Sequence, residues 1–133
     1  MSAARILIVD DNPTNQKLVS KLLKFAGHEV FNAVDAETAQ KIILSSSFDL
    51  ILMDIALPDM DGLTLTRKLK ADEKTRNIPI VALSAFAMKG DDQEAFLAGC
   101  SGYITKPINT RTFPQQVLEY LIQRDQPNIE GPP

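Results

Sequence analysis

The chain has 133 residues, which is the length of one domain. It has a single cysteine, Cys100, so an internal disulfide is excluded, and we expect this residue in the core. The net charge is -3, and 44% of the residues are hydrophobic and 23% charged, which argues against disorder and against nucleic acid as a direct partner. No basic segment precedes an apolar run near the N-terminus, and no run could span a bilayer. We therefore expect a cytoplasmic protein without membrane insertion.

Five short segments have the composition of β-strands. Residues 6–9 (ILIV), 50–53 (LILM) and 80–83 (IVAL) are continuously apolar, as are strands buried on both faces of a parallel sheet. Weaker strand candidates are Glu29–Ala33 and Gly102–Thr105.

Apolar residues at helical spacing separate and follow these strands, which predicts five helices. The residues expected on the apolar helix faces are Leu18, Leu22, Leu23 and Ala26; Ala39, Ile42 and Ile43; Leu63, Leu65 and Leu69; Phe96 and Leu97; and Val117, Leu118, Leu121 and Ile122.

Capping residues support these boundaries. Asp35 is a candidate N-cap with Glu37 in the first turn of its helix, and Gly27 suits the end of the first helix. Asp61 and Gly62 suit the start of the third helix.

Strands that alternate with helices predict right-handed βαβ units and a doubly wound α/β sandwich. We expect this domain to span residues 1–125. Residues 126–133 lack apolar periodicity and hold three of the eight prolines, so they are predicted to form a disordered tail. In doubly wound sheets, ligands bind beyond the carboxyl ends of the strands.

Polar residues follow the predicted strands at this edge. Asp10 and Asp11 come after the first strand, Asp54 after the third, Ser84 after the fourth and Lys106 after the fifth. Each of them taken alone could be a cap, a turn residue or a solvated charge. Together they place three acids, a hydroxyl and an amine at one edge of the sheet.

Clustered carboxylates repel one another unless a cation lies between them. Mg²⁺ is the cation that proteins usually hold with one or two carboxylates and several waters. In such a site a carboxylate can act as a nucleophile to form an aspartyl phosphate, while the metal and a lysine neutralise the transferring group. The strand-end residues therefore predict a magnesium-dependent phosphoryl-transfer site.

Four motifs, "VDDNP", "LILMDIALPDMDG", "ALSAFA" and "GYITKPI", occur in this order. Together they strongly resemble the receiver domain of two-component response regulators, over residues 5 to 123. The resemblance implies the flavodoxin-like fold, with a five-stranded parallel sheet in the order 2-1-3-4-5. It agrees with the α/β pattern derived from the strands and helices.

The resemblance also implies the ligands of the metal. The carboxylates of Asp10, Asp11 and Asp54 would hold Mg²⁺, and the backbone carbonyl of Ala56 would complete the set of protein ligands.

The same resemblance implies how the domain switches. Asp54 would accept a phosphoryl group from a phosphohistidine, and Lys106 would bind the phosphate and precede a cis bond to Pro107. Ser84 would be the switch hydroxyl, drawing the loop 85–89 inward, and Tyr103 the switch aromatic. The output would be a changed protein-binding face built from the fourth helix, fifth strand and fifth helix.

The chain is similar to single-domain regulators of the bacterial cell-division type and to receivers attached to hybrid histidine kinases. Its initial Met and the lack of an output domain favour a stand-alone regulator. The expected partners are a histidine kinase or histidine phosphotransfer protein and a downstream protein target. The chain itself would be a monomer or weak homodimer, and a phosphoacceptor rather than an enzyme.

Alternatives stay open on the residues alone. A metal-dependent phosphatase with an aspartyl nucleophile would also use Asp54 and Mg²⁺, although no second acid or cap is evident. A flavin-binding protein of this architecture would need a phosphate loop where Asp10 and Asp11 stand. Tyr103 could be a half-buried core aromatic. Asp59 and Asp61 are expected to be turn and capping residues, and His28 a surface turn residue.

Overall fold

The computed structural model describes residues 4–84 and 91–125, so the predicted tail, 126–133, and the switch loop, 85–89, lie outside the described residues. Five strands alternate with five helices in the described ranges, as the sequence predicts. The elements are β1 (Arg5–Val9), α1 (Pro13–Phe25), β2 (Glu29–Ala33), α2 (Ala36–Ser45), β3 (Leu50–Asp54), α3 (Gly62–Ala71), β4 (Ile80–Ser84), α4 (Asp91–Ala98), β5 (Gly102–Thr105) and α5 (Phe113–Asp125).

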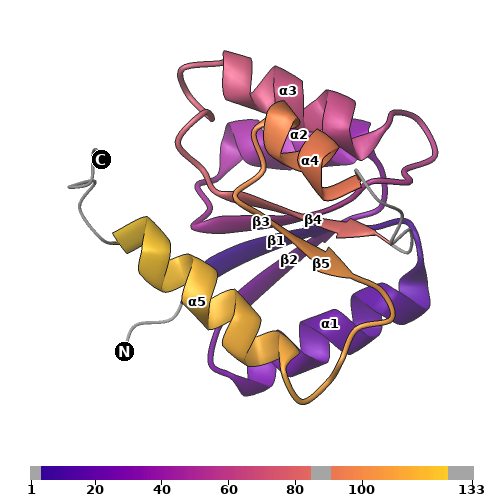
Figure 1. Ribbon diagram of the computed structural model, residues 1–133, viewed down its shortest axis with the longest axis vertical. Coiled ribbons are helices and arrows are strands. Elements are labelled where there is room, and N and C mark those ends of the chain that lie inside the picture. The colour runs from indigo at the N-terminus through magenta and orange to yellow at the C-terminus, as the bar shows by residue number, and fades with distance from the viewer. Residues whose placement is uncertain (1–3, 85–90, 126–133) are drawn as a thin grey trace.

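The strands form one parallel sheet in the order β2-β1-β3-β4-β5. Helices α1 and α5 cover one face of the sheet, and α2, α3 and α4 cover the other (Figure 1). This arrangement confirms the predicted flavodoxin-like sandwich. Strand order reverses next to β1, so the carboxyl ends of β1 and β3 flank the point where such folds bind ligands.

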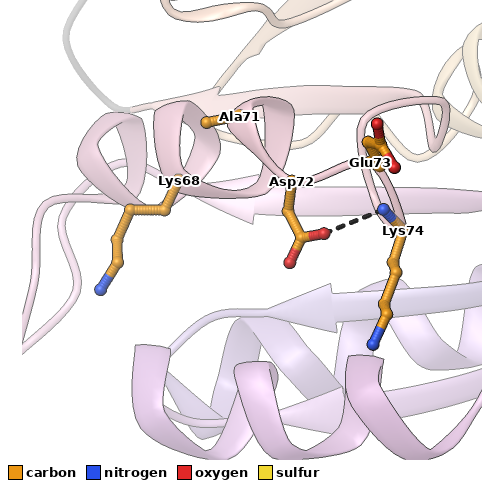
Figure 2. Close-up of a pocket in the computed structure, with 5 residues that line it drawn as sticks. All are labelled: Lys68, Ala71, Asp72, Glu73 and Lys74. Carbon is orange, nitrogen blue, oxygen red and sulfur yellow. Dashed lines mark hydrogen bonds between the residues drawn. The ribbon is translucent and has the colours of Figure 1, made fainter.

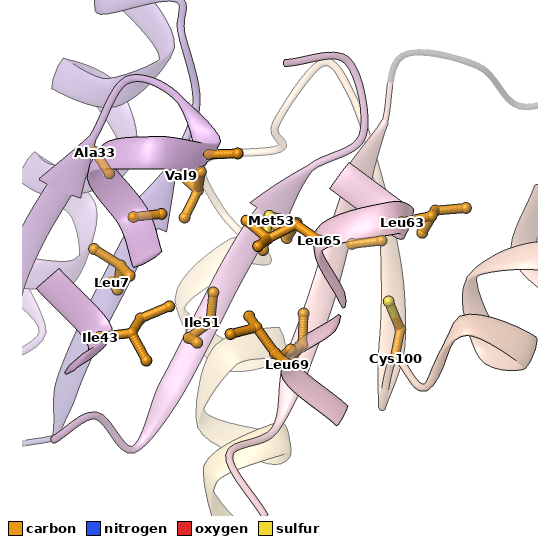
Figure 3. Packing of buried hydrophobic residues seen from close by; sticks show 14 of the residues in the cluster. Leu7, Val9, Ala33, Ile43, Ile51, Met53, Leu63, Leu65, Leu69 and Cys100 are labelled. Atoms are coloured by element: carbon orange, nitrogen blue, oxygen red, sulfur yellow. The ribbon is translucent and has the colours of Figure 1, made fainter. Parts of the chain in front are cut away.

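The continuous apolar strands are explained by two cores, one on each face. In β1, Leu7 and Val9 pack toward α2 and α3, whereas Ile6 and Ile8 pack toward α1 and α5. Figure 3 shows the first of these cores, with Leu7 of β1 beside Ile43 of α2 and Met53 of β3 beside Leu65 of α3. Cys100 lies in the same core, as predicted. A strand buried on both faces has no solvent side, which is why its sequence does not alternate.

The predicted caps are present. The Asp35 side chain accepts a hydrogen bond from the backbone N–H of Thr38 at the start of α2, and Asp61 accepts one from Leu63 at the start of α3. Gly27 follows the end of α1 with a φ of 97°, in the left-handed region that favours glycine.

The predicted apolar face of α4 is wrong. Phe96 and Leu97 are 52% and 86% exposed, and among residues 93–98, whose burial the structure describes, the buried ones are Ala95 and Ala98. These small residues pack into the core on the α3 side of the sheet. The large side chains drew the sequence prediction because size and hydropathy, rather than close packing, dominate a periodicity pattern.

Candidate phosphoryl-transfer site

Three carboxylates meet at the carboxyl edge of the sheet. Asp54 is the last residue of β3, one position beyond the predicted strand end, and Asp10 directly follows β1. Asp10 and Asp54 are buried, whereas Asp11 is exposed. One carboxylate oxygen from each of the three lies within 4.8 Å of the others. The predicted convergence of these acids is therefore present in the structure.

Lys106 is the cation that the structure places against the buried acids. Its Nζ lies 3.1 Å from Asp54 Oδ2 and 3.3 Å from Asp10 Oδ2, and its side chain is 15% exposed. The backbone N–H of Lys106 donates to the carbonyl of Ser84 at 2.7 Å, which joins the ends of β4 and β5. The peptide bond between Lys106 and Pro107 is cis, as predicted.

The electrostatics of the site are unbalanced toward negative charge. Burial raises the pKa of the Asp54 carboxyl above its ordinary value, the Lys106 ammonium opposes this shift, and the Asp10 carboxylate adds to it. Two like unit charges about 4 Å apart repel by roughly 4 kcal/mol at an effective dielectric of about 20. One lysine therefore does not neutralise three carboxylates.

This donor set fits Mg²⁺. The ion prefers oxygen ligands and keeps several waters, and the cluster offers three carboxylates, of which one, that of Asp11, belongs to an exposed residue. Since the cluster opens toward solvent at Asp11, waters can complete the coordination. The residues present thus match the group that the sequence predicts.

Backbone contacts fix the two buried acids. Asp10 Oδ1 accepts a hydrogen bond from the N–H of Asn12 at 2.9 Å, and Asp54 Oδ1 accepts one from the N–H of Ala56 at 3.1 Å. The buried Gln16 side chain on α1 donates from Nε2 to the carbonyls of Asp10, at 2.6 Å, and Ala33, at 2.8 Å. This role of Gln16 was not predicted, because the spacing of apolar residues does not signal a buried amide.

Gly62 allows α3 to begin next to Asp54. A Cβ atom at this position would lie 2.1 Å from the backbone oxygen of Asp54 and 2.9 Å from the Cα of Ile55. The N–H of Gly62 donates to the carbonyl of Ile55 at 2.8 Å. Only glycine permits this approach, so the Asp61-Gly62 pair both caps α3 and closes the loop 55–61 behind Asp54.

The two predicted switch residues lie on neighbouring strands. Ser84 is the buried last residue of β4, and it pairs in register with Thr105 of β5. Tyr103 is half-buried on β5 and packs against the core on the α3 side of the sheet. Their positions are compatible with a switch, and their roles stay predictions.

A hollow of about 470 Å³ lies away from the acidic cluster. It is lined by Lys68, Ala71, Asp72, Glu73 and Lys74 where α3 ends, and the backbone N–H of Lys74 donates to Asp72 within it (Figure 2). The chain passes from here into the amino end of β4. The hollow is therefore at the opposite edge of the sheet from the predicted site.

His28 differs from its predicted role as a surface turn residue. It is half-buried, and its Nδ1 accepts a hydrogen bond from the N–H of Ala4 at 3.2 Å. Burial lowers the pKa of its imidazole. His28 therefore ties the turn after α1 to the residue before β1.

Comparison with known proteins identifies the family. The family model described as "Response regulator receiver domain" matches residues 6–118. The chain belongs to the response regulator receiver family. The polar-differentiation response regulator DivK of Brucella ovis is 41% identical over 116 residues, which cover 87% of this chain and 94% of that protein.

Solved structures of receivers agree with the fold. A putative response regulator from Chloroflexus aurantiacus has a TM-score of 0.86 and 30% identity, over 91% of this chain and 99% of that one. The receiver domain of the sensor histidine kinase PA1611 from Pseudomonas aeruginosa has a TM-score of 0.81 and 35% identity, over 92% of this chain and 99% of that one. That structure has a magnesium ion coordinated in its active site cleft.

Membership of the receiver family makes this chain a signalling domain and gives no support to the phosphatase alternative. Within the ranges that the structure describes, no helix is long and apolar enough to cross a membrane.

Proposed function

We propose that this receiver accepts a phosphoryl group on Asp54 from a phosphohistidine of a histidine kinase or histidine phosphotransfer protein. The observation that carries the proposal is the placement of the buried Asp54 carboxylate beside Lys106 Nζ and within one cluster with Asp10 and Asp11. An Asp54 oxygen would attack phosphorus while the phosphorus–nitrogen bond to the donor imidazole breaks. The donor imidazole, protonated on its other ring nitrogen, would leave with the bonding electron pair as a neutral ring.

The proposed metal ligands are the carboxylates of Asp10, Asp11 and Asp54 and the carbonyl of Ala56. When bound, Mg²⁺ would neutralise charge on the transferring phosphoryl oxygens. Asp54 Oδ1 is already engaged by the N–H of Ala56, so this contact orients the carboxylate before transfer. Lys106 Nζ contacts the other Asp54 oxygen, Oδ2, as well as Asp10 Oδ2, so the lysine lies beside the nucleophilic carboxylate.

Lys106 would hold the transferred group. Its ammonium lies between two carboxylates, and phosphorylation of Asp54 would replace one of these partners with phosphoryl oxygens carrying about -1.5 to -2 charge. A hydrogen bond from Ser84 would form to the same group, and Tyr103 would reorient with it. Phosphorylation would thus shift a population between two arrangements of the β4 and β5 ends.

The output of this shift would be a protein-binding face on α4, β5 and α5. Large apolar side chains are exposed on two of these elements: Phe96 and Leu97 on α4 are 52% and 86% exposed, and Ile122 on α5 is 46% exposed. Exposed apolar groups of this kind suit a downstream protein target rather than nucleic acid, since the chain has a net charge of -3.

We further propose that the regulator acts in the cytoplasm as a single-domain protein, a monomer or weak homodimer, with its receiver in residues 1–125. The match over 94% of the DivK relative supports the single-domain arrangement. A receiver within a larger histidine kinase is the competing arrangement, and the likeness to the PA1611 receiver supports it.

The proposal is tested by incubating the protein with Mg²⁺ and acetyl phosphate and measuring intact mass and amide NMR shifts. We expect one hydroxylamine-sensitive phosphoryl group on the wild-type protein and on Asp72→Asn, a matched acid change at the opposite edge. Asp54→Asn should carry none, and its amide signals at Ser84 and Tyr103 should not move. Labelling of Asp54→Asn at the wild-type rate would refute Asp54 as the acceptor.

A further inference from the structure

Asp59 is a capping residue, as predicted, but the helix that it caps is distant in the sequence. It lies in the loop 55–61 after Asp54, yet its carboxylate caps a helix 23 positions earlier in the chain. Asp59 Oδ1 accepts a hydrogen bond from the N–H of Ala36 at 2.9 Å, and Oδ2 accepts one from Glu37 at 3.1 Å. Both oxygens of one carboxylate are thus held at the first turn of α2.

Two aspartates share the N-terminus of α2. Asp35 is the local N-cap and takes the N–H of Thr38, whereas Asp59 takes those of Ala36 and Glu37. The hydrogen bond from Ala36 lowers the pKa of the Asp59 carboxyl, so Asp59 is ionised at neutral pH. A negative charge at this position is stabilised by the exposed N–H groups and the helix dipole.

The loop that Asp59 tethers also orients the phosphoacceptor. The Ala56 N–H, three residues before Asp59, donates to Asp54 Oδ1 at 3.1 Å. The loop is closed upon itself where Gly62 N–H meets the carbonyl of Ile55. Asp59 adds an attachment outside the loop, to a helix on the same side of the sheet as α3 (Figure 1).

We propose that Asp59 is a positioning residue for the metal and phosphoryl site. By fixing the loop 55–61 to α2, it holds Ala56, and through the Ala56 N–H the carboxylate of Asp54, in the orientation that Mg²⁺ binding requires. This inference rests on the proposed function. Without the attachment, residues between Ile55 and Asp59 gain conformational freedom that Mg²⁺ binding must then remove.

The coupling is reciprocal. If attachment of Asp59 favours Mg²⁺ binding, bound Mg²⁺ stabilises the attachment by the same factor. The amide signals of Ala36 and Glu37 should therefore move when Mg²⁺ is added to the wild-type protein, although neither residue belongs to the metal site. In Asp59→Ala these two signals should not respond.

The test is a titration with Mg²⁺ alone, followed by amide NMR, on the wild-type protein, Asp59→Ala and Asp35→Ala. Asp35→Ala is the matched control, because it removes one acid from the same helix terminus without releasing the loop. We expect Asp59→Ala to bind Mg²⁺ about tenfold more weakly, the lower end of what supporting residues around metal ligands usually contribute. Asp35→Ala should stay within about twofold of the wild type.

A fourth protein, Asp59→Asn, guards against unfolding of the alanine variant, since its amide oxygen can still accept one of the two hydrogen bonds. Its Mg²⁺ affinity should lie between those of the wild type and Asp59→Ala. Thermal unfolding of all four without Mg²⁺ gives the loss of stability alone.

The outcomes separate this inference from the function on which it rests. If the wild-type protein binds Mg²⁺ and both Asp59 variants match it, Asp59 is a helix cap only and the positioning role is refuted. An equal loss of affinity in Asp35→Ala and Asp59→Ala would also refute it, because weaker capping of α2 would then explain both. If the wild-type protein does not respond to Mg²⁺, the proposed metal site fails, and the inference fails with it.

Discussion

The two edges of the sheet handle charge in opposite ways. At the amino edge, Arg5 forms an ion pair with Glu29 at 3.1 Å, and its guanidinium lies 4.7 Å from the ring centre of Phe31 and 5.8 Å from that of Phe48. The Asp49 carboxylate nearby accepts the backbone N–H of Arg5 at 2.8 Å.

At the carboxyl edge, by contrast, the two buried carboxylates of Asp10 and Asp54 share Lys106, and the exposed carboxylate of Asp11 joins their cluster. The amino edge is built for stability, with partners of opposite charge and two aromatic rings that meet edge to face. The carboxyl edge keeps an excess of negative charge that folding alone does not require. Where a fold leaves like charges together, a ligand of opposite charge is the economical explanation.

The largest difference between the edges should come from removing the cation at each. Lys106→Met leaves two buried carboxylates without an ammonium, which should lower the free energy of unfolding by about 3 kcal/mol without Mg²⁺. Mg²⁺ should restore stability more in this variant than in the wild type, because the metal and the lysine compete for the same carboxylates. Urea unfolding with and without Mg²⁺ measures both quantities. An unchanged stability would show that Lys106 is not needed to balance the acids.

The corresponding change at the amino edge, Arg5→Met, should cost about 1 kcal/mol. The Arg5 side chain is 37% exposed, and exposed ion pairs and cation–π contacts each contribute about 1 kcal/mol or less. The same urea experiment should show a response to Mg²⁺ identical to that of the wild type. A loss of stability that depends on Mg²⁺ would indicate that the two edges are coupled.

The excess negative charge at the carboxyl edge should also make stability depend on pH. Because the pKa of Asp54 is raised above 3.8, the folded protein binds this proton more tightly than the unfolded chain. Stability without Mg²⁺ should therefore fall as the pH rises from 3.8 through the raised pKa. Asp54→Asn should remove this fall and raise the unfolding midpoint at neutral pH by a few degrees. A lower midpoint in Asp54→Asn would mean that the ionised Asp54 is stabilising.

At the amino edge the pH response should have the opposite sign and be the smallest of these effects. Burial lowers the pKa of His28 below 6.5, and its neutral Nδ1 accepts the N–H of Ala4. Stability should be lost as the pH falls from 6.5 through the lowered pKa, and His28→Ala should lack this response. The hydrogen bond itself is worth about 1 kcal/mol or less. Thermal unfolding of the wild-type protein and of His28→Ala over this pH range tests the prediction. If the unfolding midpoints of the two proteins change with pH in parallel, His28 is not the group responsible for the response.

Much of the site could be predicted because its residues terminate strands. Asp10 and Lys106 directly follow β1 and β5, Asp54 ends β3, and parallel strands bring their carboxyl ends together whatever the loops do. The helix caps Asp35 and Asp61 were predictable for a similar reason, since each acts within three residues of its own position. The exposed face of α4 was not predictable. The buried contacts of this helix are made by alanines, which carry little hydropathy signal.

The sequence by itself determined the alternation of strands and helices, the parallel sheet and the edge at which the acids gather, because these follow from local periodicity and from residues adjacent to strand ends. Only the tertiary structure decided which atoms meet: the Asp59 carboxylate at α2, the Gln16 amide at the ends of β1 and β2, and His28 at Ala4. Each of these contacts joins a polar group to a backbone group of another element. Which backbone group becomes the partner is set by how those elements pack in three dimensions. Because backbone groups are the same in every residue but proline, the local pattern of side chains does not identify that partner.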